Sequence, residues 1–583
     1  MNRMLLLLVL LCSATPCARA QSDFEQRAAR IRAQYDAPET PGILSAAVRY
    51  AARRELSYAD SLFLTCKEIT APKGDMFWMY LAIGTYLHGK DVMSPEAARA
   101  ARNVWKTYFP YRGDTENHWC LYYTSLYLAA ESWPGLPGSE WYNGRSSDEN
   151  LREAREYLTH WIDLTTRLGQ GEFDSPTYLP EYVIPMSLLG QFALDPQMKK
   201  RGRMMLEYLL ADFAADHLDG MYCGGSARDG ATAVFTPRSV PAAEFAYLYF
   251  DGPDVPVSGW TLFPALSDFR LPQVIFGIAT DRATPVLTKE RKRVRNVIRH
   301  GAERNPPVYK TTWMTSEYGL SSLQGGILQP IQQHTWSVRF KSAKPYSTIF
   351  GLHPYWSGRE LAMFFPEQEK MLVDDVIKSK GTYSKETKWT GSSPYERIYQ
   401  HRNTLLALYD IPAGTSTGHI DLFFPKTLAE RIVDTSGWIL CRAGDTYIGV
   451  YPLQRGEWMR LGEDESNHRF RSSFRQNGYV VEVRSKKEAG SFEEFRKRCL
   501  VQTPFFSLRE GRVSVTYTSI DGDLLNFAFP DQRFLNGTAV DLSKYKLFDS
   551  PFLQSEVNSN LLRITHNGRT RTLNFRTLTT TEK

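Results

Sequence analysis

Three short segments in the first half of the sequence carry more polar and aromatic side chains than packing alone requires. They span residues 116–119, 171–178 and 220–230, and each lies where a loop meets an expected helix. In a fold built from helical hairpins, the loops at one end converge on a common cleft. Residues about 50 positions apart in sequence can therefore meet there and form a site.

The chemistry that needs such a set is β-elimination from a uronate. The C5 proton of a uronate becomes acidic only when the adjacent carboxylate is neutralised, and the amide of Asn117 can donate a hydrogen bond to that carboxylate as charge develops. A tyrosine oxygen can then take the C5 proton or protonate the leaving O4, and a nearby cation favours the phenolate form. We assign these roles to Tyr178, Arg228 and His118.

Other residues of the same segments are predicted to bind the substrate rather than to react with it. They are Glu116, Trp119, Asp174, Ser175 and Tyr222. A purely structural interpretation stays open for each segment. In that interpretation Asn117 and Asp174 only cap helices, Tyr178 packs into the core and Arg228 lies on a solvated edge.

The elements that must position these residues are helices. Apolar residues recur at helical spacing through 151–165, after a Ser146-x-x-Glu149 capping box. A second helix is predicted to begin at Asp195-Pro196 and to end near Gly220. Similar patterns occur at 76–88, 119–131, 180–192 and 244–250. Helices joined by loops with no strand signal between them favour an (α/α) toroid of stacked helical hairpins.

Short alternating segments dominate the chain after residue 305. They lie at 335–340, 404–409, 438–442, 447–453, 479–484 and 513–518. Asn567-Gly568 between two such segments predicts a tight hairpin, and Gly444-Asp445 predicts another. Strands with almost no helix between them predict an antiparallel β-sandwich. The expected fold class is therefore multidomain α+β, with a toroid at 21–305 and a sandwich at 306–583.

The first twenty residues predict export. A basic start at Arg3 precedes an apolar run at 5–11, and Ala18-Arg19-Ala20 is a small-x-small cleavage site before Gln21. The predicted signal peptide is therefore 1–20, and the mature chain is expected to be periplasmic or secreted. No later apolar run is long enough to cross a bilayer, so we expect no integral membrane segment.

Charge and ligand spacing limit the partners and cofactors. The formal net charge of +6 falls to +4 when Arg3 and Arg19 are removed, and the basic residues are dispersed. We therefore expect an anionic polysaccharide or oligosaccharide substrate and no nucleic acid. No spacing of Cys, His, Asp or Glu calls for a metal, so no cofactor is expected, although Asp, Glu or His side chains of the strand-rich half could hold a structural divalent metal.

A resemblance to a known family is carried by Asn117-His118, by Asp-Ser-Pro-Thr-Tyr at 174–178 and by Ser226-Ala227-Arg228. These motifs resemble cleft segments of the helical-toroid polysaccharide lyases, which include the heparinase II/III, alginate lyase and chondroitin AC lyase groups. The runs 436–445 and 478–483 resemble the sandwich domain of those enzymes. The resemblance implies a toroid, a sandwich and a catalytic Asn, His, Tyr and Arg group.

The histidine of that group is not fixed by the resemblance. In these lyases the carboxylate-binding Asn and the catalytic His are usually far apart in sequence, whereas Asn117 and His118 are adjacent. Neighbouring helical residues point about 100° apart, so both need not face one substrate. His334, His353 and His401 from the second half are the alternatives, and we count the first two among the substrate-binding residues.

Two other functions stay open on sequence alone. A glycoside hydrolase on a similar toroid would use two carboxyl groups from Glu116, Asp174, Glu181 and Asp229. A non-catalytic glycan-binding protein would use its aromatic side chains to stack on sugars. The products separate the three: an unsaturated uronate end, a hydrated reducing end, or no product.

Overall fold

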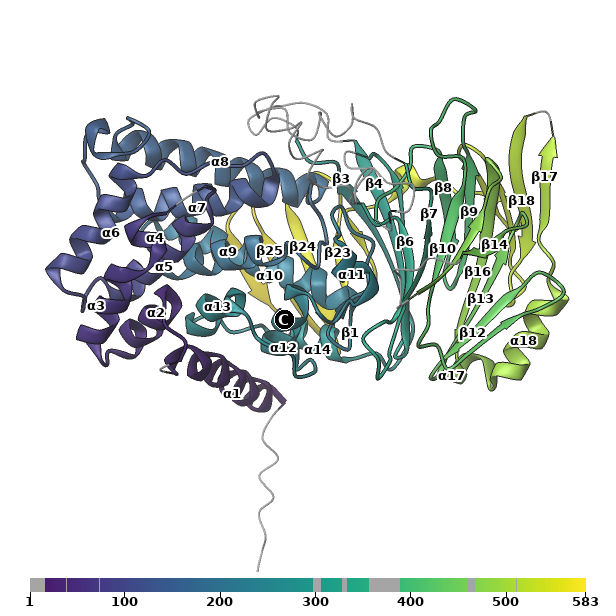
Figure 1. Cartoon of the computed structure of the whole chain (residues 1–583), viewed down its shortest axis with the longest axis horizontal. Coiled ribbons are helices and arrows are strands. Elements are labelled where there is room, and N and C mark those ends of the chain that lie inside the picture. The colour runs from purple at the N-terminus through teal and green to yellow at the C-terminus, as the bar shows by residue number, and fades with distance from the viewer. Residues whose placement is uncertain are drawn as a thin grey trace, which may run out of the picture.

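The structure is a computed structural model that describes residues 16–37, 39–72, 74–296, 306–327, 333–355, 388, 390–459, 467–509 and 511–583. A helical region extends to Thr280 and is followed by an antiparallel, sheet-rich region that begins at Val286 (Figure 1). The expected order of helices and then strands is therefore confirmed. Residues 1–15 of the predicted signal peptide lie outside the described residues.

The helices of the first region are α1 (Pro16–Asp36), α2 (Ile43–Ala52), α3 (Leu56–Thr65), α4 (Lys67–Thr70), α5 (Phe77–Gly89), α6 (Pro95–Thr107), α7 (Glu116–Ser132), η1 (Gly138–Glu140), α8 (Ser147–Leu168), α9 (Pro180–Phe192), α10 (Pro196–Asp216), α11 (Ala231–Phe235), α12 (Pro241–Phe250), η2 (Gly259–Thr261), α13 (Leu262–Leu266) and α14 (Gln273–Thr280). Short helices α17 (Lys486–Ala489), α18 (Phe492–Val501) and η3 (Leu542–Lys544) follow in the second region.

The ends of two helices follow the predicted capping chemistry. Ser146 and Glu149 form the capping box of α8, and the side chain of Asp195 caps α10, whose first residue is Pro196. Along the chain, α7 packs against α5, α8 and α9, and α10 packs against α9 and α14. In the part of the chain that the structure describes, no helix combines the length and apolarity that a membrane span needs.

A hairpin interrupts the helical region just before Arg228. Strands β1 (His217–Leu218) and β2 (Met221–Tyr222) pair antiparallel across Asp219-Gly220. The φ angles of these two residues are 52° and 81°, the left-handed values of a type I′ turn. The sequence pattern predicted only a helix end near Gly220, although an Asp-Gly pair is a hairpin signal.

The strands of the second region are β3 (Val286–Arg293), β4 (Pro307–Met314), β5 (Tyr318–Gly325), β6 (Trp336–Phe340), β7 (Thr348–Leu352), β8 (Glu396–His401), β9 (Thr404–Asp410), β10 (Ile420–Pro425), β11 (Glu430–Val433), β12 (Ile439–Ala443), β13 (Thr446–Pro452), β14 (Glu457–Met459), β15 (Asn467–Ser472), β16 (Gln476–Ser485), β17 (Phe505–Arg509), β18 (Arg512–Thr518), β19 (Leu524–Ala528), β20 (Gln532–Leu535), β21 (Thr538–Ala539), β22 (Phe548–Asp549), β23 (Leu553–Ser555), β24 (Leu561–His566), β25 (Arg569–Asn574) and β26 (Thr579–Glu582). The predicted hairpins are confirmed, because Gly444-Asp445 joins β12 to β13 and Asn567-Gly568 joins β24 to β25.

These strands form three antiparallel sheets. A 13-stranded sheet has the order β14-β15-β10-β7-β6-β5-β4-β3-β22-β23-β24-β25-β26, a six-stranded sheet β11-β12-β13-β16-β9-β8, and a five-stranded sheet β17 to β21. The six-stranded sheet shares one core with the large sheet and another with the five-stranded sheet. Because both of its faces are buried, β16 has an unbroken buried run rather than the alternation of a half-exposed strand.

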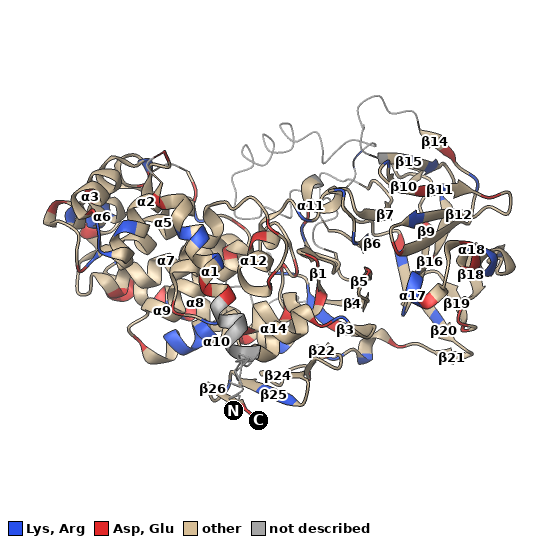
Figure 2. Ribbon diagram, turned by 90° about the horizontal axis from the view of Figure 1, so that it is seen from below, with Lys and Arg blue, Asp and Glu red and all other residues tan. Residues whose placement is uncertain are grey.

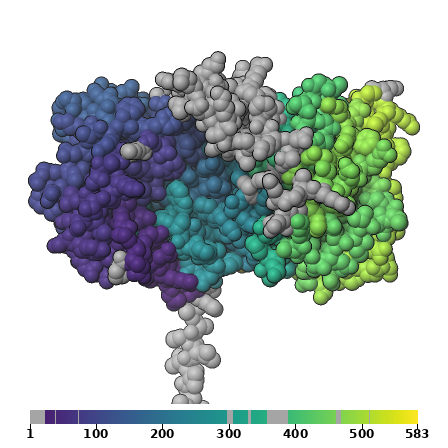
Figure 3. All heavy atoms as spheres, in the orientation of Figure 1, coloured from purple at the N-terminus to yellow at the C-terminus, as the bar shows by residue number. Residues whose placement is uncertain are grey.

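The end of the chain returns to the helices. Strands β22 to β26 extend the large sheet and pack against α10 and α14, and they appear yellow behind the helices (Figure 1). Leu562, Ile564 and Leu573 from these strands are at most 1% exposed and belong to the same apolar core as the helices. The helical and strand-rich regions form one elongated body (Figure 3).

This packing predicts that a residue near the C-terminus stabilises the helical region. Leu573→Ala should lower the free energy of unfolding by about 2–5 kcal/mol, because it removes a fully buried side chain and leaves a cavity. Thermal or denaturant unfolding followed by helical circular dichroism measures the change. Arg569→Ala at an exposed position of the same strand should change little, and equal stability of the two variants would contradict the packing.

Candidate functional site

The buried carboxylate of Glu172 joins the three segments predicted from sequence. It accepts hydrogen bonds from the backbone N–H of Asn117, at 3.1 Å, and from the Asn117 amide. The guanidinium of Arg228 lies 3.3 Å from it, and that of Arg295 lies 3.2 Å from it. Burial alone raises the pKa of Glu172, but Arg228, Arg295 and the Asn117 hydrogen bonds outweigh burial and lower it. Glu172 is therefore an anion.

The start of α7 is held in a similar way by Glu116. This side chain accepts from the Trp161 indole N–H at 2.8 Å and from the backbone N–H of Gly171 at 3.2 Å, and it pairs with Arg293 at 3.1 Å. A side chain at position 171 would overlap the Glu116 carboxylate, so only glycine fits there. Glu116 is 3% exposed. It therefore positions the first two segments and does not face the solvent.

Tyr178 and Arg228 contact each other directly. Arg228 donates a hydrogen bond to the phenol oxygen of Tyr178 at 3.2 Å, and its guanidinium carbon lies 4.1 Å from the ring centroid. Ser175 fixes both partners, because its hydroxyl donates to the backbone carbonyl of Arg228 at 2.5 Å and accepts from the backbone N–H of Tyr178 at 3.2 Å. Tyr178 is partly exposed, whereas Arg228 is 6% exposed. The phenol is therefore accessible and its cation is not.

His118 lies next to this group as a neutral imidazole. Burial, with the nearby charge of Arg228, lowers the pKa of His118 to about 3. Its ring packs edge-on against Phe77, with centroids 5.8 Å apart, and its Nδ1 has no hydrogen-bond partner among the described residues. The neighbouring Asn117 is fully buried and points to Glu172. The two adjacent side chains therefore make different contacts.

A small hollow of about 20 Å³ lies beside Glu172. Its walls include Arg228, Arg293 and Arg295 together with Gln333. This volume holds about one water molecule. The three guanidiniums contact two carboxylates, those of Glu116 and Glu172.

Asp174 belongs to a second cluster of buried charges, which joins the helices to the large sheet. The ammonium of Lys292 lies 3.2 Å from Asp174, 2.5 Å from Asp212 and 3.0 Å from Glu290. These three carboxylates are close enough together to bind a metal ion, but the Lys292 ammonium already contacts all three. A cation therefore occupies the position among them that a metal would need.

The remaining predicted residues have structural contacts. The Trp119 indole donates to Gly113 at 2.8 Å, and Tyr222 stacks on Phe213 with centroids 4.7 Å apart. The backbone of His334 pairs with Ser226, which brings the large sheet next to the third segment. His353 bonds to Ser393 and Thr417 within the strand-rich region.

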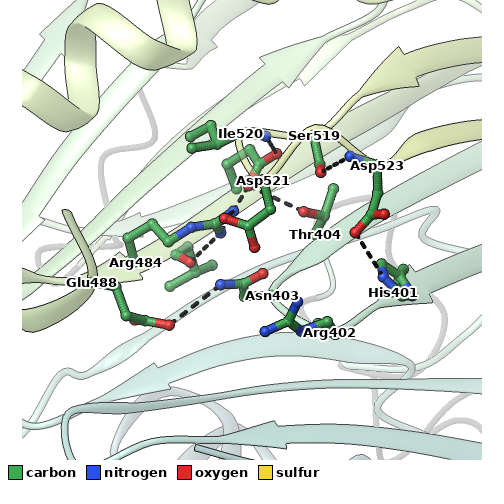
Figure 4. A network of polar contacts seen from close by, with 12 residues as sticks. His401, Arg402, Asn403, Thr404, Arg484, Glu488, Ser519, Ile520, Asp521 and Asp523 are labelled. Atoms are coloured by element: carbon green, nitrogen blue, oxygen red, sulfur yellow. Dashed lines mark hydrogen bonds and ion pairs between the residues drawn. The ribbon is translucent and has the colours of Figure 1, made fainter.

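His401 and Asp229 are likewise engaged. His401 contacts Asp523 at 3.1 Å in a polar network between the six-stranded and five-stranded sheets (Figure 4). Asp229 pairs with Arg339 at 3.3 Å, and burial raises the pKa of Asp229 to about 7.

Arg293, Arg295 and Glu172 received no role from sequence. The two arginines lie in a basic run, 289–295, for which no function was predicted. Their spacing of two residues was a usable signal, since alternate residues of an extended chain share a face. Glu172 was named only as part of its loop. In the ribbon view, basic and acidic residues are interspersed over both regions (Figure 2).

A comparison with models of known protein families and with curated protein sequences gives no match to this chain. The site is therefore described by its own geometry. It combines a partly exposed phenol held by a buried guanidinium, a neutral imidazole and a group of arginines, a set suited to proton transfer next to an anion.

Glu181 at the start of α9 generates a prediction on pH. Burial raises the pKa of Glu181 from 4.5 to about 8. Such a carboxyl stabilises the fold fully below pH 4.5, and this contribution is lost as the pH rises through 8. Glu181→Gln cannot ionise, so its stability relative to wild type should increase by about 3–5 kcal/mol between pH 4.5 and 8.

Denaturant unfolding at a series of pH values tests this. Glu156→Gln, at an exposed position of α8, serves as the control and should follow the wild-type profile. Parallel profiles of Glu181→Gln and wild type would show that Glu181 ionises as an ordinary carboxyl.

Proposed function

We propose that the chain is a polysaccharide lyase that cleaves a uronic-acid-containing glycan by β-elimination. The observation that carries the proposal is the contact between the accessible Tyr178 phenol and the buried Arg228 guanidinium, beside the arginine group around Glu172. In the same proposal, the helices at 21–305 form an (α/α) toroid, the strands at 306–583 form a β-sandwich, and the protein is exported to the periplasm or secreted.

In the proposed reaction, Tyr178 transfers the proton. Its oxygen, as phenolate, takes the C5 proton of the uronate. The C5–H electrons form the C4–C5 double bond while the C4–O4 bond breaks, and the resulting phenol returns its proton to O4. The hydrogen bond from Arg228 stabilises negative charge on the phenolate oxygen.

The substrate carboxylate needs a positive partner, and in this proposal a guanidinium of the arginine group supplies one. Asn117 acts through Glu172 in this proposal, because its backbone N–H and its side-chain amide bond to that carboxylate and the side chain is fully buried. His118, which is neutral, serves as a hydrogen-bonding group next to the reacting sugar and not as a cation.

A glycoside hydrolase is the second candidate, and one observation favours it. The pKa of Glu181 is raised to about 8 by burial, whereas the pKa of Glu172 is lowered by its guanidinium partners in spite of burial. Two carboxyls whose pKa values are driven apart are a common arrangement for an acid and a base. Glu181 is 3% exposed, however, so substrate has less access to it than to Tyr178.

The decisive variant is Tyr178→Phe. It removes one oxygen and keeps the ring, so the fold should survive, and kcat should fall by about 10²-fold or more because the proton carrier is lost. A screen of uronate polysaccharides, followed by ultraviolet absorbance of the unsaturated product, gives the assay. Tyr127→Phe removes a hydroxyl that bonds to Glu131 in the same helical region, and it should keep wild-type activity.

Glu181→Gln separates the two enzymes in the same assay. A lyase should retain most of its activity in this variant, whereas a hydrolase should lose it and should release saturated reducing ends. Full activity of Tyr178→Phe would end the lyase mechanism for any substrate.

A further inference from the structure

A cavity of about 360 Å³ lies where the three sheets meet. Its walls come from the adjoining ends of β4 and β5, from the start of β8 and from the segment 531–543. Its innermost polar residues, Gln333, Thr335, Glu396 and Arg533, are each at most 8% exposed, whereas Ser543 at its mouth is exposed. The volume lies within the range of about 300–1,000 Å³ that is usual for ligand pockets.

Hydrogen-bonding groups of the wall are held in place by the fold. Arg533 donates to the backbone carbonyl of Ile398 at 3.1 Å and to the Gln324 side chain at 2.6 Å. Glu396 accepts from the Tyr409 hydroxyl at 2.5 Å, and burial raises the pKa of Glu396 to about 7. The wall therefore offers rigid donors beside a carboxyl that is only partly ionised near pH 7.

The charged residues of the wall limit the charge and the polarity of the ligand that the cavity can bind. Two guanidiniums, Arg397 and Arg533, stand beside three carboxyl groups, Glu396, Asp531 and Asp541. This balance does not suit a phosphate dianion, and the polar floor does not suit a lipid. It suits a ligand with many hydroxyl groups, which both donate and accept, and with at most one negative charge. Tyr309 and Val540 supply apolar surface for the face of a sugar ring.

The cavity adjoins the candidate site. Gln333 lines both this cavity and the small hollow beside Arg228. Along β4, Val308 lines the hollow and the next residue, Tyr309, lines the cavity. At the end of β5, Gly325 lines the cavity and Gly326 lines the hollow. A ligand in the cavity is therefore next to the site, separated from it by the end of one strand pair.

We propose that this cavity binds one sugar unit of the glycan, at a distance from the reacting bond. The identity of the glycan rests on the proposed function, whereas the sugar chemistry of the cavity rests on its own wall. Binding here would align a polymer along the end of β4 and β5, so that the neighbouring units reach Tyr178.

Saturation-transfer NMR on the full-length protein tests the cavity without any catalytic assay. The probes are D-glucuronate, D-galacturonate, N-acetyl-D-glucosamine and D-glucose. Wild type should show transfer to at least one of them. Ser543→Trp, which places a large ring at the mouth, should weaken that binding by about tenfold or more. Lys544→Trp, at the next residue of η3, does not line the cavity and should bind as wild type.

A second variant is needed because the indole of Ser543→Trp could point to the solvent and leave the cavity open. Arg397→Ala removes a guanidinium from the wall and should weaken binding of a uronate more than binding of glucose. No transfer from wild type, undiminished binding in both cavity variants, or an equal loss in Lys544→Trp would overturn the proposal. Tyr178→Phe should bind the sugars normally. If that variant is also fully active, the lyase proposal fails while the cavity proposal stands.

Discussion

The buried contact between two lysines of the large sheet and the carboxylates of the helical region is the constraint on which the site depends. Lys292 and Lys310 lie among Asp174, Asp212, Asp216 and Glu290, and all six side chains are at most 6% exposed. Burying so many charges is costly unless they neutralise one another. Burial and the neighbouring acids raise the pKa of Asp212 well above its ordinary value, and burial raises that of Asp216 to about 6, so protonation reduces the excess negative charge. The ion pairs of Lys292 fix the position of the end of β3. The residues that follow, Arg293 and Arg295, therefore lie next to Glu116 and Glu172.

Local sequence patterns predicted the helices, strands and turns, whereas the way these elements pack together depends on contacts between residues far apart in sequence. The capping box at Ser146 and the Asn567-Gly568 turn act over a few residues, so the sequence alone reveals them. The partners of Glu172 come from α7, from the loop at Arg228 and from the end of β3, and no local pattern specifies that convergence. The same holds for the C-terminal strands, whose apolar residues such as Leu573 could as well have packed within a separate strand domain. The three candidate segments could be predicted because they carry more polar and aromatic side chains than packing requires. No feature of the sequence distinguishes Glu172, the residue that joins them, from other acidic residues.

The adjacent pair Asn117 and His118 shows how helix geometry divides two roles. Consecutive helical residues point about 100° apart. Asn117 accordingly turns inward and bonds to Glu172 through its backbone N–H and its side-chain amide. His118 packs beside Phe77 and keeps a ring nitrogen without a hydrogen-bond partner among the described residues. The Asn117 amide is fully buried and directed at Glu172, so it is not placed to contact a substrate. Its contribution is therefore to fix the orientation of Glu172, which in turn fixes Arg228. The histidine, although neutral, is the member of the pair that is left to contact a ligand.

In the proposed reaction, the loop at 171–178 accounts for the position of Tyr178. Gly171 fits only as glycine against Glu116, and Asp174 adopts a left-handed φ of 54°, which costs free energy that its ion pair with Lys292 offsets. Ser175 then bonds to the backbone of Arg228. Each of these contacts restricts the backbone conformation before Tyr178 and so fixes the position of the phenol. The side chain of Tyr178 nevertheless stays partly exposed. A reacting group that is held by rigid neighbours and open to the solvent is the arrangement that proton transfer to a bound substrate requires.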